Sequence, residues 1–328
     1  LAAFNGDALR ELAAQFLALS ERQGAAIQLM IGHRLMGTSL LHAGDFGQCR
    51  SHFDRAITLY DPATHRPLAA RFGQDSGVAI LCYRSWAQWM LGCPEASLAD
   101  ADRALKYAQE IDHAPTLMFA LTHLSITYIL CRKDEAATAL LNQIVALADE
   151  KGALFWKNGS IMLQGCVLSL NGEAAAAVKM ITSVIAAARS TGATMWLPLY
   201  LLHLGNAYGH LGEYDEAWGF IGEAMTTIEA TKERWWESEL NRTAGELALK
   251  SRGANAEEYF DRALVIARRQ QAKSWELRAA MSMARLWRDQ GKREEARELL
   301  APVYGWFTEG FDTLDLKEAK ALLDELAS

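Results

Sequence analysis

The side chains best suited to chemistry in this sequence are eight histidines and five cysteines. A zinc site needs several such ligands at short, regular spacings, as in His-Glu-x-x-His or paired Cys-x-x-Cys motifs. Neither motif occurs, and the histidines that fall in helical patterns are spread over separate expected first helices: His33, His42, His123, His203 and His210. The sequence therefore predicts no metal site.

Motifs for catalysis on nucleotides and esters are also missing from the sequence. A phosphate-binding loop needs Gly-x-x-x-x-Gly-Lys followed by Ser or Thr, whereas Gly291-Lys292 lacks both the upstream glycine and the hydroxyl. No aspartate pair follows a strand pattern, as a cyclase would need to hold two metal ions. No Gly-x-Ser-x-Gly nucleophile motif occurs either. We expect no catalytic residues, no cofactor and no enzyme activity in this chain.

Charge and hydropathy argue against two classes of partner. The formal net charge is −7 and the Lys and Arg residues are scattered, so we expect no nucleic acid. No apolar run reaches the ~18 residues that a membrane helix needs, so we expect no membrane. The cysteines lie in helical patterns, which is typical of reduced thiols in a cytoplasmic protein. Because the chain starts at Leu1 without a signal-peptide pattern, we expect a fragment of a longer cytoplasmic protein.

The elements available to position binding residues are repeated helical hairpins. The clearest copy runs from Leu201 to Ala224, where Gly205, Gly212 and Ala217 stand at tetratricopeptide spacings. Gly205 would let one helix approach its partner closely, Gly212 would form the turn, and Ala217 would be the small contact on the second helix. The sequence thus predicts an all-α fold, a right-handed α-α superhelix of the tetratricopeptide-like solenoid type.

Six other segments align on the Ala217 column and give a period of about 40 residues. Its other members are Cys49, Ser97, Ala136, Ala177, Ala256 and Ala296. The turn column holds Gly44, Gly92, Gly172, Gly212 and Gly291, with Cys131 and Ser251 in the two weakest copies. A bulky column further along the second helix holds Phe53, Leu140, Ile181, Ile221, Phe260 and Leu300, with Ala101 as the exception.

We therefore expect a single solenoid over residues 1–328. An N-terminal helix (1–23) would cover one end, and a capping helix within 310–328 would cover the other. Seven hairpins are expected between them, at 24–60, 76–111, 114–150, 155–190, 195–231, 235–271 and 274–309. An insertion at 61–77 separates the first two.

Four tryptophans recur with nearly the same period, and each opens a first helix: Trp156, Trp196, Trp236 and Trp275. An aromatic ring at this position can fill the wedge between successive hairpins. We interpret this ladder as architecture, with ligand stacking as the alternative.

First helices line the concave surface of a tetratricopeptide-like stack, so their outward residues face a groove. By register the groove residues are Arg34, Thr38, His42, Trp86, Trp89, Ser125, Tyr128, Asn206, His210, Arg285 and Arg288. Aromatic and cationic side chains together suit a peptide or a small anionic effector, through stacking and charge-assisted hydrogen bonds. An ordinary packed or solvated helix face is the alternative for each residue taken singly.

The insertion at 61–77 contains two of the six prolines and breaks the helical pattern. Loops on a rigid scaffold often carry recognition, and the charged or titratable side chains here are His65, Arg66, Arg71 and Asp75. They could bind an anion or a partner's carboxylate. The alternative is that they bond to local backbone and seal the longer connection.

Three strings are more specific than a generic repeat: YDPATHRPLAARFGQDSGVA, TKERWWESELNRTAGELAL and the closing segment from ARRQQAKSWELRAAM to LLDEL. With them the chain resembles, over nearly its whole length, the C-terminal repeat region of bacterial multidomain proteins. Those proteins join a class III adenylate/guanylate cyclase domain and a STAND or AAA-like signalling ATPase to tetratricopeptide-like repeats. The resemblance implies a regulatory arm, with the catalytic domains upstream of this chain.

Two functional hypotheses follow. In the first, the chain is a non-catalytic sensor that binds a protein, peptide or small effector in its groove and regulates upstream domains of the same polypeptide. In the second, it is a free-standing adaptor that binds peptide segments of partner proteins. An enzyme is disfavoured because no convergent acid, base or nucleophile set occurs.

Overall fold

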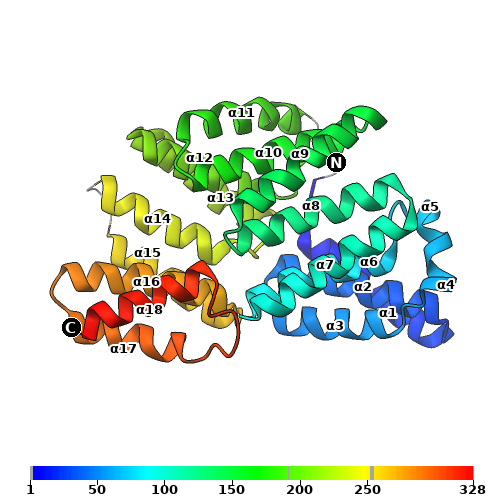
Figure 1. Ribbon diagram of the computed structural model, residues 1–328, viewed down its shortest axis with the longest axis horizontal. Helices are drawn as coiled ribbons and strands as arrows, with labels where there is room; N and C mark the ends of the chain where they lie inside the picture. Colours follow the sequence, from blue (N-terminus) through cyan, green and yellow to red (C-terminus); the bar gives the residue numbers. More distant parts are fainter. Residues whose placement is uncertain (1–2, 191, 252–254, 328) are drawn as a thin grey trace.

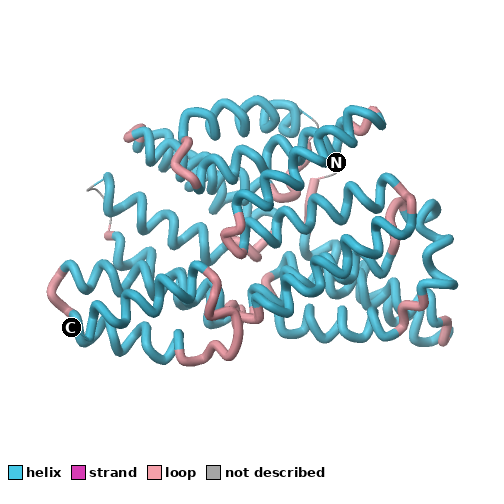
Figure 2. Tube along the Cα trace, viewed as in Figure 1, coloured by secondary structure: helices cyan, strands magenta, loops and turns pink. Residues whose placement is uncertain are grey.

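The computed structural model describes residues 3–190, 192–251 and 255–327, and within these ranges the chain is helical without any strand. Figures 1 and 2 show helices joined by short loops into antiparallel hairpins. The first helices of the seven hairpins are α2 (Ala26–Ala43), α6 (Ser76–Met90), α8 (Ala114–Leu130), α10 (Leu154–Leu170), α12 (Leu197–Leu211), α14 (Glu237–Ser251) and α16 (Lys273–Asp289). The predicted all-α, tetratricopeptide-like solenoid is confirmed.

The second helices are α3 (Phe46–Thr58), α7 (Pro94–Ile111), α9 (Asp134–Lys151), α11 (Ala174–Ser190), α13 (Tyr214–Thr231), α15 (Ala256–Arg269) and α17 (Arg293–Tyr304). Each packs on the first helix of its own hairpin and, except for α17, on that of the next. First helices also pack on one another in chain order, so they form the inner layer and the second helices form the outer layer. At the ends, α1 (Gly6–Gln23) covers α2, and α18 (Leu314–Ala327) covers α16 and α17.

The hairpin of α12 and α13 explains the repeat pattern physically. A Cβ atom on Gly205 would lie 2.8 Å from Ile221 of the facing helix, so only glycine permits this close approach. Gly212 ends α12 with φ of 79°, in the left-handed region that glycine adopts without strain. Ala217 and Ile221 are buried beneath these contacts.

The third hairpin departs from the predicted register by one residue. The left-handed turn position is occupied by Arg132, with φ of 56°, and not by Cys131. The buried small and bulky positions of α9 are therefore Ala137 and Leu141, each 0% exposed, one residue after those expected. A non-glycine residue at the turn removed the signal on which the alignment depended.

The insertion forms three short helical segments: α4 (Pro62–His65), a 3-10 turn at Arg66–Leu68, and α5 (Ala69–Phe72). Asp61 begins α4 by accepting hydrogen bonds from the backbone N–H groups of Ala63 and Thr64. The absence of a long helical period, which suggested a loop, reflects helices of a single turn.

The two ends of the solenoid close on each other. Figure 1 shows the α16–α18 end (orange and red) beside the α6–α7 hairpin (cyan), and α6 packs against α16. The segment between α17 and α18 caps α7: Glu309 accepts hydrogen bonds from the N–H groups of Glu95 at 2.9 Å and Ala96 at 3.1 Å. Gly310 N–H donates to the Glu95 carboxylate at 2.8 Å. We call these contacts the Glu309 latch.

Candidate functional site

An aromatic cluster fills the axis of the solenoid where the second and sixth hairpins meet. Trp86 of α6 stacks on Trp235 with ring centroids 5.1 Å apart and planes at 8°. His123 of α8 stacks on Trp86 at 4.8 Å, and Trp196 contacts Trp86 edge-on at 5.9 Å. Trp86 is fully buried and Trp235 is 1% exposed. These four side chains (Trp86, His123, Trp196 and Trp235) are called the axial aromatic cluster. They fill the concave channel of the solenoid at this point, so a ligand cannot pass through it in this conformation.

Two buried histidines are neutral: His123 within this cluster and His42 beside it. Each donates from Nδ1 to the backbone carbonyl one turn earlier, His42 to Thr38 at 2.9 Å and His123 to Phe119 at 2.8 Å. Burial lowers the pKa of His42 to about 4 and the pKa of His123 to about 3. Their rings therefore act as packing groups at neutral pH.

Glu233 is a buried carboxylate that joins the fifth and sixth hairpins. It accepts hydrogen bonds from the Trp235 indole N–H at 3.0 Å and from the Trp196 backbone N–H at 3.0 Å. Burial raises the pKa of Glu233 to about 7, against the lowering effect of these two donors.

Arg278 of α16 contacts several elements at another position along the axis of the solenoid. Its guanidinium lies over the rings of Trp89 and Trp275, at 4.9 Å and 5.1 Å from their centroids. It donates to the Leu130 carbonyl at 2.7 Å and pairs with Asp315 of α18 at 2.8 Å. One partly buried cation thus holds α6, α8, α16 and α18 together.

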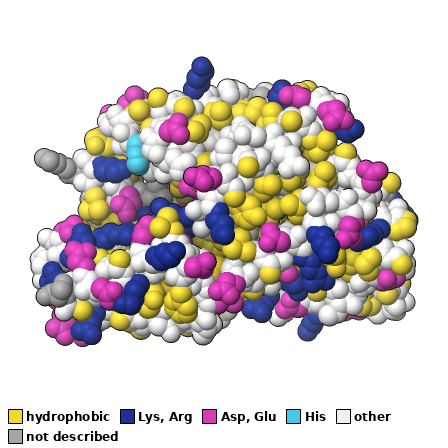
Figure 3. All heavy atoms as spheres, in the orientation of Figure 1, with side chains coloured by type: hydrophobic (Ala, Val, Ile, Leu, Met, Phe, Trp, Pro, Cys, Tyr) yellow, Lys and Arg dark blue, Asp and Glu magenta, His cyan; other side chains and the backbone are white. Residues whose placement is uncertain are grey.

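Arg278 also lines a small cavity, the inner pocket. It is bounded by α8, α10, α12, α14 and α16, and its volume is about 50 Å³. Figure 3 shows a hollow rimmed by cationic and acidic side chains between the α12–α14 region and the α16–α18 region. The lining residues are Ile129, Leu130, Leu170, Leu202, His203, Asn206, Trp236, Glu239, Arg242, Thr243, Glu246 and Arg278.

The charges of the inner pocket are already paired. Arg242 forms a bidentate pair with Glu239, with both distances 2.8 Å. Its remaining nitrogen lies 3.3 Å from Glu246, which also accepts from Ser282 at 2.7 Å. Burial would raise the pKa of Glu239, but Arg242 outweighs burial and the net shift is downward. Because both carboxylates pair with Arg242, this guanidinium is not free to bind an anionic ligand.

Four of the predicted groove residues are buried in the closed axis. Trp86 and His42 are 0% exposed, Trp89 is 2% exposed, and Ser125 is 0% exposed with its hydroxyl donating to the Leu121 carbonyl. The expectation that they face an open groove does not hold in this structure, because the solenoid curves until its own hairpins fill that space. Whether a ligand contacts them after opening stays a prediction.

Three further predicted groove residues lie at different places along the inner layer. Asn206 lines the inner pocket and donates to the Ser169 carbonyl at 3.2 Å. The Tyr128 hydroxyl donates to Asp102 at 3.3 Å. His210 is exposed. Of these three, only Asn206 belongs to the pocket.

The predicted groove arginines have separate surroundings. Arg285 and Arg288 of α16 pair with the capping helix, at 3.1 Å to Glu318 and 3.0 Å to Glu325. Arg34 is partly buried, its backbone carbonyl accepts from Thr38, and burial lowers the pKa of its guanidinium. These residues do not converge on one site.

The insertion residues mainly support local structure. His65 is buried and bonds to the Asp61 backbone, and Asp75 is fully buried, accepting from the Tyr60 hydroxyl at 3.0 Å and from Val78 N–H at 2.9 Å. Arg66 pairs with Glu110 at 2.6 Å. Arg71 is exposed, with its guanidinium 5.6 Å from the centre of the Phe72 ring.

Most of the inner pocket was missed from the sequence. A signal was present at the start of α14 and along it: Trp236, just before the helix, and Glu239, Thr243 and Glu246 recur at three- and four-residue spacings and so share one face. From sequence alone this face is typical of a solvent-exposed helix surface. Only the position of the neighbouring first helices shows that it lines a pocket.

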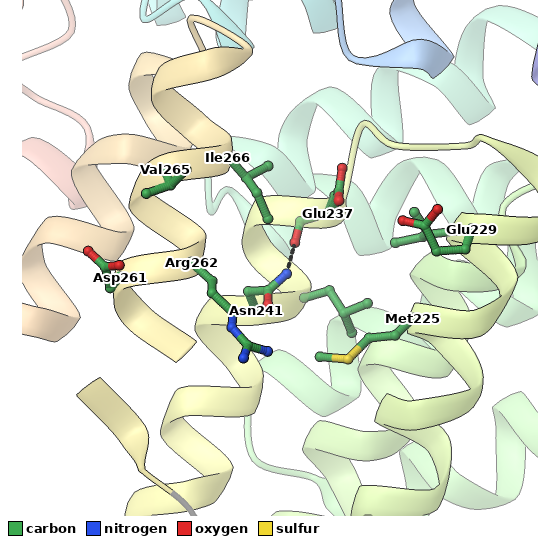
Figure 4. Close-up of a pocket in the computed structure, with 10 residues that line it drawn as sticks. Met225, Glu229, Glu237, Asn241, Asp261, Arg262, Val265 and Ile266 are labelled. Carbon is green, nitrogen blue, oxygen red and sulfur yellow. Dashed lines mark hydrogen bonds between the residues drawn. The ribbon is translucent and has the colours of Figure 1, made fainter. Parts of the chain in front are cut away.

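A second cleft lies on the outer face between α13 and α15, with a volume of about 340 Å³ (Figure 4). Its floor is largely apolar, with Met225, Leu240 and Val265, and Asn241 donates to the Glu237 carbonyl at 2.8 Å. The side chains that line this cleft include no buried polar atom without a partner. The outer cleft therefore gives less indication of a missing ligand than the inner pocket does.

Within the described ranges no helix is long and apolar enough to cross a membrane, and no group of three or more His, Cys, Asp or Glu side chains is placed to hold a metal ion. The described cysteines are all free thiols.

No family model matches this sequence, and no curated protein does. Solved structures are similar in fold. A Rap protein complexed with Competence and Sporulation Factor matches with a TM-score of 0.58 and 12% identity, covering 97% of this chain and 93% of that one. NprR in complex with its cognate peptide NprX matches with a TM-score of 0.57 and 11% identity, over 92% and 88%.

The Rap conjugation gene regulator of plasmid pLS20, in complex with the Phr* peptide, has a TM-score of 0.58 and 11% identity, over 90% of this chain and 76% of that one. At such identities the likeness concerns the fold. This chain has the tetratricopeptide-like solenoid fold that those regulators also have.

Proposed function

We propose that this chain is a non-catalytic regulatory module that binds an extended peptide segment along its concave channel. The observation that carries the proposal is the inner pocket, a partly polar cavity to which five successive first helices contribute. The three similar structures, each solved with a bound peptide or factor, support this class of ligand. Side chains from several repeats would then contact one continuous peptide segment.

Binding would act through the closure of the solenoid. The axial aromatic cluster occupies the space that a long ligand needs, so a peptide must bind best to a more open curvature. A ligand shifts a population by its differential affinity for the two states. The Glu309 latch and the Trp86–Trp235 stack are the contacts that such a shift would break.

The target of regulation is a separate proposal. The resemblance to cyclase–ATPase proteins favours regulation of ATPase or cyclase domains joined to this solenoid. A free-standing adaptor that binds peptide segments of partners is the alternative. Free, mostly buried cysteines suit a reducing compartment, and we propose a cytoplasmic location.

Selection of displayed random dodecapeptides against the purified chain tests the binding proposal. We expect enriched peptides with micromolar affinity by calorimetry, and a changed radius of gyration on binding. Asn206→Trp, which fills the inner pocket, should weaken binding at least tenfold, whereas Val265→Trp in the outer cleft should not. No enrichment over empty resin, or equal loss in both variants, would contradict the proposal.

A further inference from the structure

The inner pocket holds three buried polar atoms without a hydrogen-bond partner. They are Nδ1 and Nε2 of His203, which is 2% exposed, and Nε1 of Trp236, which is 4% exposed. The two rings lie edge to face with centroids 6.3 Å apart, and both line the cavity. An unpaired buried polar group costs about 1–3 kcal/mol, so three at one small cavity indicate a missing partner.

The protonation state of His203 defines what that partner must offer. Burial lowers the pKa of His203 to about 4, so the ring is neutral near pH 7 and has one N–H donor and one acceptor nitrogen. The Trp236 indole can only donate. A complementary group must therefore accept from the indole and either donate to or accept from the imidazole.

The charges around the pocket select against an ionic partner. Arg242 is paired with Glu239, and Arg278 is paired with Asp315 and the Leu130 carbonyl. A carboxylate would find no free cation and would lie beside Glu239. An ammonium group has no acceptor capacity and would leave the Trp236 N–H unpaired.

The size of the cavity limits the group that fits. The centre of a water-sized sphere can occupy about 50 Å³ of the cavity, so the cavity has room for more than the single water that ≈ 10–15 Å³ admits. The apolar wall of Leu130, Leu170 and Leu202 suits an aliphatic stem. A carboxamide on such a stem has the required acceptor oxygen, the required donor nitrogen and the required size.

We propose that His203 and Trp236 form a subsite for a neutral carboxamide, the side chain of a glutamine or asparagine in a peptide bound along the channel. The carboxamide oxygen accepts from the Trp236 indole, and its NH2 group donates to the unprotonated nitrogen of His203. The proposal rests on the peptide-binding function for its physiological source. The same chemistry would also accept a free small amide.

Nitrogen-15 NMR of the full chain tests the subsite with propionamide as the probe, after assignment of the Trp236 indole signal from Trp236→Phe. We expect this signal to shift and saturate with propionamide, and propionate and 2-butanone to bind at least tenfold more weakly. His203→Phe keeps the ring volume and should abolish the shift. His210→Phe, at an exposed position two turns further along the same helix, is the matched control and should leave it unchanged.

Peptides separate this subsite from the wider function. If selected peptides bind and their Gln→Glu or Asn→Asp variants lose at least tenfold in affinity, the subsite stands as proposed. If peptides bind while propionamide leaves the Trp236 signal unmoved, the subsite is wrong and the binding function stands. If propionamide binds but no peptide does, the subsite serves a free amide and the peptide function is wrong.

Discussion

Trp86 and Trp235 stack face to face across the axis, although they belong to the second and sixth hairpins. The Trp86 indole also donates to the His123 carbonyl at 3.0 Å. This pair places side chains of one end of the solenoid within the packing core of the other.

Trp86→Ala should lower the free energy of unfolding by about 3–5 kcal/mol, because it removes a fully buried ring. It also removes the hydrogen bond from the Trp86 indole to the His123 carbonyl. Urea unfolding followed by circular dichroism measures the loss. Trp306→Ala, at a ring that is 45% exposed, should cost less than half as much, and equal losses would contradict the closed axis.

Glu309→Ala should weaken closure, because α7 loses its capping carboxylate, at a cost of about 0.5–2 kcal/mol. We expect faster hydrogen exchange at the Glu95 and Ala96 amides and a larger radius of gyration by small-angle scattering. Glu298→Ala, at an exposed position of α17, is the control. Unchanged exchange at the α7 amides would argue against the latch.

Stability should fall as the pH drops from about 6.5 toward 4. Burial lowers the pKa of His42 and His203 to about 4 and of His123 to about 3, from 6.5 in the unfolded chain. The unfolded state therefore binds more protons in this window. Each histidine lowers the free energy of unfolding by about 1.4 kcal/mol per unit of difference between its unfolded and folded pKa. Urea midpoints at pH 7.5 and pH 4.5 measure the slope. His123→Phe should flatten it more than His210→Phe, and identical slopes would contradict neutral burial.

Glu233 should have the opposite effect on stability. Its pKa of about 7 in the folded chain lies above the ordinary value of 4.5, so the folded state binds the proton more tightly. The stabilisation is present below pH 4.5 and is lost as the pH rises through 7.

The comparison with Glu233→Gln isolates this effect from that of the histidines. The stability of the variant relative to the native chain should rise between pH 4.5 and 7.5, by an amount on the order of 3 kcal/mol. A difference that does not vary with pH would show that Glu233 titrates normally.

The repeat pattern was readable because its residues act locally. Gly205, Gly212 and Ala217 each satisfy a demand of one hairpin, so their spacing alone indicates the helices and the turn. Arg132 shows the limit of this reading, since a left-handed arginine at the turn leaves no glycine to align and shifts the expected register of its hairpin.

The candidate site could not be read in the same way. The stack of Trp86 on Trp235 depends on the small rotation added by every hairpin between them, and no local pattern encodes that sum. For the same reason Trp86 and Trp89 could be placed on first helices without any sign that the axis would close over them. His203 and Trp236 become neighbours in a pocket only after that curvature is fixed.

The Glu309 latch has a consequence for how the chain unfolds. An open array of repeats loses structure from its termini inward, because each terminal unit has one neighbour only. Here the second hairpin is held by the segment that follows the seventh, and the backbone N–H of Arg234 donates to the His42 carbonyl at 2.6 Å, joining the first hairpin to the sixth. Because the end hairpins are tied to one another in this way, the repeats should melt together as one cooperative unit.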